Sequence, residues 1–549
     1  MGTIGIALAM LAAVVLSGVL IRMLPFAVPT PLAQIALGAV IAAFSDHAVR
    51  LEPDIFFLLF LPPLLFLDGW RIPKEGLLRD QGMILELALG LVFCTVIGMG
   101  FFIHWMIPAM PLPVAFALAA IVSPTDPVAV SAITERVAIP SRALHVLEGE
   151  SLLNDASGLV CFRFAVAAAL TGSFSLPAAS LAFVQLALGG VAIGAGLTFA
   201  VMMIKNGISS HFGEEAGSQV LISLLLPFAA YQAAEHAGCS GILAAVSAGI
   251  TMSYMELSGR ALGTTRMQRT AVWDTVQFAL NGVMFVLLGE QLPDILSGAL
   301  NVVQQSNHEN PVWLVAHVLA INLGLAVLRF LWVWLSLRLN AFVAAIRGEP
   351  VATKPSLRLI GAVSVAGVRG AITLAGVLTL PLTLADGSPF PARDLTIFLA
   401  AGVIILSLIA ANMFLPRLLR GLDMPAESAH EQEIDRAQVA AAEAAIRAIE
   451  RTSHELADSQ SDADLYAQAA ARVMELYRRR IEGRTQTGES AASIRRSDDI
   501  ERRIRLAGLR AERDTVFALA RSQSLSDASA RRLVREIDLL EERLTRRVH

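Results

Sequence analysis

The sequence predicts an all-α polytopic membrane protein that ends in a soluble helical region. Of its 549 residues, 55% are hydrophobic and only 16% are charged, whereas a soluble protein averages about a quarter charged. The mean hydropathy is +0.61. The charge is also uneven, because 44 of the first 420 residues are charged against 46 of the last 129. The first part is therefore expected to face lipid and the second part water.

Apolar runs long enough to cross a bilayer recur through the first 420 residues. We count thirteen candidate spans: 3–24, 31–45, 54–70, 82–107, 112–133, 149–172, 180–204, 217–236, 239–256, 272–290, 311–337, 359–383 and 395–419. The second and third are short, which predicts tilting or partial burial by neighbours. The first lacks a basic segment and a cleavage site, so we interpret it as a span rather than a signal peptide.

Basic residues in the loops predict the orientation. Alternate loops, starting after the first span, carry fourteen of them: Arg22, Arg71, Lys74, Arg79, Arg136, Arg142, Lys205, Arg260, Arg266, Arg269, Arg338, Arg347, Lys354 and Arg358. The opposite loops carry only Arg50 and Arg393. Because positively charged loops stay in the cytoplasm, the N-terminus is expected outside and the C-terminal region inside.

The chain is thus predicted to hold a transmembrane domain, 1–420, and a cytoplasmic domain, 421–549. In the second domain apolar residues recur every three or four positions among Glu and Arg, which is typical of amphipathic helices. We expect a small solvated bundle, with a ligand-binding sensor as the alternative. The net charge of -4 argues against a nucleic-acid partner. Three cysteines in apolar runs offer neither a disulfide framework nor a thiolate metal site.

The fifth span contains an expected break. Pro124 and Pro127 bracket Thr125 and Asp126, and two prolines three residues apart should interrupt the helix near its middle. Breaks inside a membrane are tolerated where the freed backbone groups line a cavity, and transporters use them to coordinate cations. A proline kink in which Asp126 caps the second half-helix is the alternative.

The sixth span places further oxygen-bearing side chains on one turn of helix. Ser151 and Asp155 are four residues apart on one face, and Glu150 and Asn154 share the adjacent face. Because these groups all present oxygen, they suit a hard alkali cation rather than a transition metal. A carboxylate at membrane depth is a functional candidate by default. Glu150 near the span's end has simple solvation as its alternative.

The twelfth span carries a matching interruption. Gly367 and Gly370 flank Arg369, and glycine weakens a helix at that point. Corresponding interruptions in two halves of a transporter indicate inverted repeats with a site near the midplane. Spans 1–6 and 8–13 are the predicted repeats.

The motifs SPTDPVAV, GESLLNDASGLV, GVRGAIT and LPPLLFLDGW resemble those of the sodium/proton exchanger family of cation:proton antiporters. The resemblance covers residues 5–420 and is closest to the bacterial branch with an Asn-Asp pair. It implies that Na⁺ is held by Asp155, Ser151 and Thr125, with Asp126 completing the site and Glu150 nearby.

The resemblance also implies supporting roles. Asn154 would hold the broken helix where electrogenic relatives carry a second aspartate. Arg369 would balance the broken region or pair with Glu150, and Arg329 matches a second intramembrane arginine. Asp68 matches an acidic position of the family, but its place near a loop suggests solvation.

These expectations combine into a function. Cation and proton would compete for Asp155, giving electroneutral one-for-one exchange by alternating access in the bacterial plasma membrane, with a role in pH homeostasis. The family implies a homodimer and no cofactor, and the cytoplasmic domain offers a place for a regulator. K⁺/H⁺ or Li⁺-tolerant antiport and an uncoupled channel are the alternatives. An intramembrane aspartyl protease built on Asp126 and Asp155 is a further alternative, but cation binding explains the neighbouring Ser, Thr and Asn as well. No nucleophile elbow or metalloprotease motif occurs that would indicate another enzyme.

Overall fold

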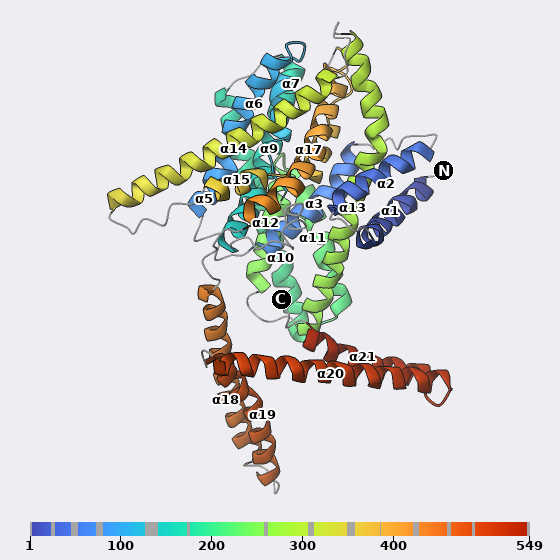
Figure 1. Cartoon of the computed structure of the whole chain (residues 1–549), viewed down its shortest axis with the longest axis vertical. Helices are drawn as coiled ribbons and strands as arrows, with labels where there is room; N and C mark the ends of the chain where they lie inside the picture. Colours follow the sequence, from blue (N-terminus) through green and yellow to red (C-terminus); the bar gives the residue numbers. More distant parts are fainter. Residues whose placement is uncertain are drawn as a thin grey trace. The chain divides into compact units, whose positions relative to one another are not determined.

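The computed structural model describes residues 3–23, 28–44, 53–72, 81–126, 141–172, 176–256, 262–305, 312–347, 357–384, 386–420, 428–457, 463–485 and 489–545. These residues are almost entirely helical and form no strands, which confirms the predicted fold class (Figure 1). The chain divides into two compact units, Met1–Leu422 and Asp423–His549.

The helices of the first unit follow the predicted spans in order. They are α1 (Thr3–Met23), α2 (Thr30–Phe44), α3 (Pro53–Arg71), α5 (Gln81–Leu85), the π-helix η1 (Glu86–Leu91), α6 (Val92–Met106), α7 (Leu112–Ile121), α9 (Ser141–Thr171), α10 (Leu176–Phe212), α11 (Ala216–His236), α12 (Gly241–Glu256), α13 (Gly263–Gln305), α14 (Val312–Arg347), α15 (Leu357–Val365), α16 (Ala371–Leu378) and α17 (Arg393–Leu419). Seven helices in the described residues are long and apolar enough to span a membrane, alongside shorter apolar ones. The number thirteen stays a prediction.

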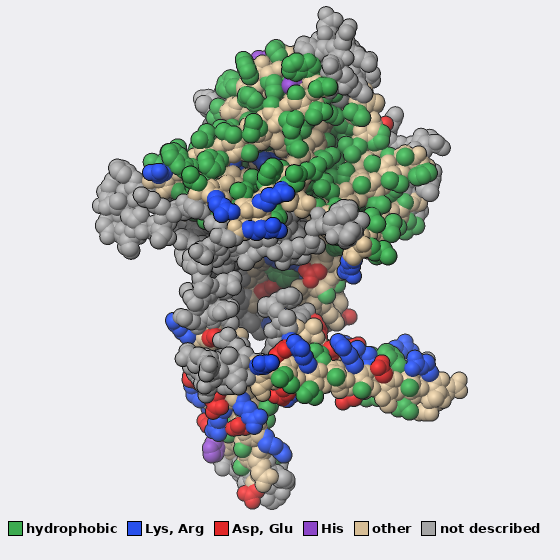
Figure 2. Space-filling model, viewed as in Figure 1, with side chains coloured by type: hydrophobic (Ala, Val, Ile, Leu, Met, Phe, Trp, Pro, Cys, Tyr) green, Lys and Arg blue, Asp and Glu red, His purple; other side chains and the backbone are tan. Residues whose placement is uncertain are grey.

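The outer surface of the first unit is apolar. Large hydrophobic side chains such as Leu8, Leu188 and Leu323 are exposed on α1, α10 and α14, and Figure 2 shows hydrophobic side chains over a broad face. Soluble proteins rarely expose apolar patches of this extent. The exterior is therefore suited to lipid.

Two helix crossings of the same kind hold one group of helices together. Gly38 on α2 and Gly289 on α13 lie so close that a methyl group on either would overlap the partner's backbone. Gly249 on α12 and Gly69 on α3 form an equivalent crossing. Small residues allow this approach between membrane helices. In the predicted repeats, α2 corresponds to α12 and α3 corresponds to α13. The α2–α13 crossing and the α12–α3 crossing are therefore equivalent, and each joins a helix of one repeat to a helix of the other.

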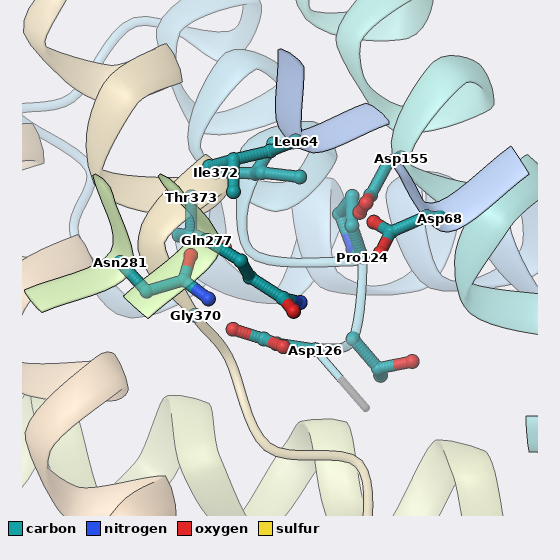
Figure 3. A pocket seen from close by; sticks show the side chains of 11 residues that line it. Leu64, Asp68, Pro124, Asp126, Asp155, Gln277, Asn281, Gly370, Ile372 and Thr373 are labelled. Carbon is teal, nitrogen blue, oxygen red and sulfur yellow. The ribbon is translucent and has the colours of Figure 1, made fainter. Parts of the chain in front are cut away.

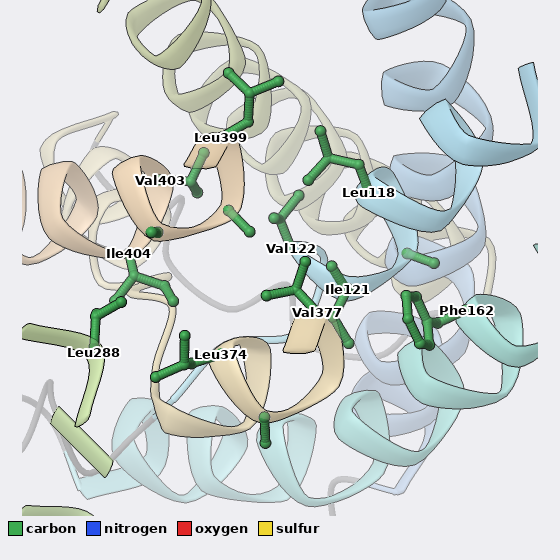
Figure 4. Packing of buried hydrophobic residues seen from close by; sticks show 14 of the residues in the cluster. Leu118, Ile121, Val122, Phe162, Leu288, Leu374, Val377, Leu399, Val403 and Ile404 are labelled. Atoms are coloured by element: carbon green, nitrogen blue, oxygen red, sulfur yellow. The ribbon is translucent and has the colours of Figure 1, made fainter. Parts of the chain in front are cut away.

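A second group of helices packs through aliphatic side chains. Ile121 at the end of α7, Leu374 and Val377 on α16, and Val403 on α17 are buried together (Figure 4). The two groups meet mainly where α13 packs against α17, whereas α9 touches α3 and α12 only sparsely. The interrupted spans belong to this second group.

The second unit consists, in its described residues, of α18 (Ser428–Ala457), α19 (Ala463–Thr485), α20 (Glu489–Arg521) and α21 (Asp527–Thr545). α18 packs on α19, and α20 packs on α21, where Arg513 forms an ion pair with Asp538 at 2.9 Å. The regulatory role of this unit stays a prediction.

The glycine crossings lead to a stability prediction. Gly289→Ala should lower the free energy of unfolding by about 1–3 kcal/mol, because the added methyl group meets the Ile35 carbonyl oxygen. Gly18→Ala on α1 is the matched control, since nothing lies within contact of its added methyl group. Thermal unfolding in detergent measures both variants. Equal melting temperatures for the two would contradict the close crossing.

Candidate cation-binding site

In the fifth predicted span, the described helix ends at the expected place. α7 ends at Ile121, and residues 122–126 are not helical. Pro124 lies within this stretch, whereas Pro127 and the predicted second half of the span fall outside the described residues. The freed backbone of the stretch finds a partner in the other half of the chain, because the Asp126 N–H donates to the Val368 carbonyl at 2.7 Å.

The twelfth span is interrupted as well. α15 ends at Val365, and α16 begins at Ala371. Between them, the buried Arg369 side chain donates from Nε to the Val122 carbonyl at 2.8 Å and from Nη1 to the Gly367 carbonyl. Its backbone N–H donates to Ser407 Oγ on α17 at 3.1 Å. Arg369 therefore satisfies carbonyl groups of both breaks.

The charges at this crossing complement the helix ends. Arg369 binds the carbonyl of Val122, at the C-terminal end of α7, where the helix dipole is negative. Asp126 lies against Gly370, the residue that caps the positive N-terminal end of α16. A side chain at position 370 would overlap the Asp126 carboxylate. The positive Arg369 of the second break thus lies at the negative end of α7, and the negative Asp126 of the first break lies at the positive end of α16.

α9 binds the first break through two side chains. Ser151 Oγ donates to the Thr125 carbonyl at 2.6 Å, and Asn154 Nδ2 donates to Thr125 Oγ1 at 3.0 Å. All three residues are buried. These bonds fix the orientation of Thr125, so its carbonyl retains a second lone pair in a defined direction.

A small, partly open cavity lies at the crossing (Figure 3). Its walls are formed by Leu64, Asp68, Pro124, Thr125, Asp126, Asp155, Gln277, Asn281, Gly370, Ile372 and Thr373. Asp155 is only 5% exposed. No ion pair or hydrogen bond joins its carboxylate to another residue in the described part of the chain. This buried carboxylate is therefore available to a ligand.

Glu150 does not lie in this cavity, contrary to its predicted place beside the cation. Its two carboxylate oxygens accept hydrogen bonds from Arg329 at 2.5 and 2.7 Å, and its side chain is 1% exposed. Arg329 Nε also donates to the Val363 carbonyl at 3.2 Å. The partner of Glu150 is therefore Arg329 rather than Arg369, and the pair joins α9 to α14 and α15.

Asp68 lies in the cavity, although its position near a loop suggested simple solvation. Its carboxylate lines the cavity on the side of Asp155 (Figure 3). Gln277 and Asn281 on α13 also line the cavity and were missed. The spacing of these two amides, four residues apart in an apolar run, was the signal in the sequence that could have identified them.

The cavity's polar groups are carboxylates, amides, hydroxyls and carbonyls. Such oxygen donors suit an alkali cation, and no set of His, Cys, Asp and Glu suited to a metal ion occurs among the residues with described positions. The fold and the site together define a multi-pass membrane protein that presents a buried carboxylate at the crossing of two interrupted helices, an arrangement found in secondary transporters.

Comparisons with known proteins identify the family. The family described as sodium/hydrogen exchanger, transmembrane, matches residues 8–421, so the chain belongs to this family of transporters. It is 41% identical over 542 residues to the uncharacterized Na⁺/H⁺ exchanger YjcE of Escherichia coli (strain K12), covering 97% of each chain.

Two further comparisons cover about three quarters of the chain. A sodium, potassium, lithium and rubidium/H⁺ antiporter of Bacillus pumilus (strain SAFR-032) is 46% identical over 413 residues, which are 75% of this chain and 60% of that protein. The sodium proton antiporter MjNhaP1 of Methanocaldococcus jannaschii has the same fold, with a TM-score of 0.59 at 19% identity over 76% of this chain and 98% of that one.

The buried ion pair gives a second prediction. Arg329→Gln should lower the free energy of unfolding by about 3–5 kcal/mol, because it leaves the Glu150 carboxylate buried and charged. The double variant Glu150→Gln/Arg329→Gln should recover most of this loss, since neither charge remains. Thermal unfolding in detergent measures both. A loss of stability in the double variant equal to the sum of the losses in Glu150→Gln alone and Arg329→Gln alone would contradict the pairing.

Proposed function

We propose that this chain exchanges a monovalent cation, Na⁺ first, for H⁺ at Asp155. The observation that supports this most directly is that two carboxylates on α9, Glu150 and Asp155, have different surroundings. Glu150 has both oxygens bound by Arg329, whereas Asp155 faces a cavity without a basic partner in the described residues. A buried carboxylate needs a counter-charge or a proton. Cation and proton are thus alternative occupants of one site.

Alternating access supplies the coupling. The site is proposed to move between the two faces of the membrane only when a cation or a proton neutralises Asp155. Each movement in one direction with the cation then requires a movement in the other direction with the proton. Thr125, Ser151 and Asp126 would complete the cation's coordination, because they lie around the same break of the fifth span. The interrupted helices on both sides of the cavity are typical of transporters that work in this way.

Asn154 supports an electroneutral stoichiometry. It is neutral at all relevant pH values, and its amide donates to Thr125 rather than to an ion. α9 therefore brings one exchangeable charge, Asp155, to the cavity. We infer that one cation moves against one proton without net charge transfer.

The cation range is open to K⁺ and Li⁺. Oxygen ligands accept all the alkali cations, and the Bacillus relatives are named for sodium, potassium, lithium and rubidium. An uncoupled channel is the second candidate, and coupling experiments separate it from the exchanger. We further propose a plasma-membrane location with the second unit in the cytoplasm as a regulatory domain, and a homodimeric assembly.

Removal of the Asp155 charge tests the site. Asp155→Asn should abolish cation-dependent proton movement in proteoliposomes, because the amide holds neither a proton nor a cation with the same affinity. Ser157→Ala is the matched control, since among the described residues its hydroxyl donates to the Leu153 carbonyl of its own helix, and it should retain exchange. The assay is run with Na⁺, Li⁺ and K⁺ at several pH values. Exchange that persists in Asp155→Asn would refute the assignment.

The stoichiometry has its own test. At fixed ion gradients, an imposed membrane potential should change neither the initial rate nor the endpoint of exchange. Proteoliposomes with a pH-sensitive dye report both quantities. An endpoint that follows the voltage would contradict the electroneutral mechanism, and Na⁺ flux without proton movement would favour a channel.

A further inference from the structure

The cavity takes its walls from two groups of helices. Asp155 and the broken segment around Asp126 belong to the group that contains α7, α9, α16 and α17. Asp68 lies on α3, and Gln277 and Asn281 lie on α13. α3 and α13 belong to the other group, which the glycine crossings hold together. The two carboxylates that face one another in Figure 3, Asp68 and Asp155, therefore come from different groups.

Asp68 lies beside Asp155 in the cavity. The two carboxylates face one another, whereas the Asp126 side chain lies lower in the view (Figure 3). Apolar side chains, Leu64 and Ile372, form part of the wall around them, and charges interact strongly where water is partly excluded. A second negative charge at this position favours a cation in the cavity.

One residue of the cavity wall, Gln277, contacts the exposed end of α3. Gln277 accepts a hydrogen bond from Arg71 Nη1 at 2.7 Å, and Arg71 also pairs with Asp274. Arg71 and Asp274 are 37% and 59% exposed. The loop charges predict that this end of α3 faces the cytoplasm. Asp68, one turn before Arg71, thus lies on the cytoplasmic side of the site.

We propose that Asp68 raises the affinity of the site for its cation on the cytoplasmic face only, because it is carried by helices that do not travel with Asp155. This inference rests on the proposed alternating access, in which one helix group moves against the other. Asp126 differs from Asp68 in this respect, because its N–H is bonded to Val368 within the moving group. When the site turns outward, Asp126 accompanies Asp155 and Asp68 remains behind.

The test compares the apparent KM for Na⁺ on each face. Everted and right-side-out membrane vesicles carrying the full chain are given Na⁺ on the outer side, and the initial rate of proton movement is recorded at equal pH. Asp68→Asn should raise KM on the cytoplasmic face on the order of tenfold and leave it within about twofold on the outer face. Asp126→Asn should change both faces alike, and Asp274→Asn, at the exposed ion pair, should change neither.

Three results would overturn the inference: an equal change on both faces for Asp68→Asn, no change on either face, or a change on the outer face alone. Asp68→Glu, which keeps the charge and is the milder substitution, should keep the wild-type ratio of the two KM values. A folded Asp68→Glu protein in which the ratio of the two KM values differs from that of the wild type would also contradict the inference. Absence of Na⁺-dependent proton movement in the wild type would instead refute the proposed function, so the two failures are distinguishable.

Discussion

The first unit depends on one constraint: backbone groups freed by interrupting a helix inside a membrane must find partners within the protein. The two interruptions meet this need together. The Asp126 N–H donates to Val368, and the Arg369 side chain donates to Val122 and Gly367. Neither break would be satisfied in this way alone. The crossing is therefore a single structural element, and it brings polar groups to the centre of an apolar unit.

The same constraint explains why Asp155 is left for a ligand. Two buried arginines lie in this helix group, and either could have neutralised it. Arg369 is used by backbone carbonyls, and Arg329 is used by Glu150 and Val363. With both guanidinium groups engaged, the buried Asp155 carboxylate has no arginine partner among the described residues. The charges that hold these helices together are therefore distinct from the one proposed to bind the cation and the proton.

The sequence predicted what depends on local pattern. Pro124 and the glycines around Arg369 marked the breaks, and helical spacing placed Ser151 with Asp155 on α9. The partner of Glu150 was not predictable, because Arg329 and Arg369 are both intramembrane arginines and nothing local distinguishes them. Asp68 was misjudged for a related reason: nearness to a helix end in sequence does not measure depth. The cavity reaches toward that end because α13 brings Gln277 alongside it.

The packing also indicates which surfaces could slide. Backbone contact at glycine leaves little tolerance for displacement, because overlap begins within fractions of an ångström. Such contacts join α2 to α13 and α12 to α3, within one helix group. Between the groups α9 makes only sparse contact with α3 and α12. The cavity lies between the two groups, since Asp155 on α9 and Asp68 on α3 both line it. In the proposed exchange, a cation or proton on Asp155 removes the repulsion between Asp155 and Asp68 and thereby acts on the boundary between the groups.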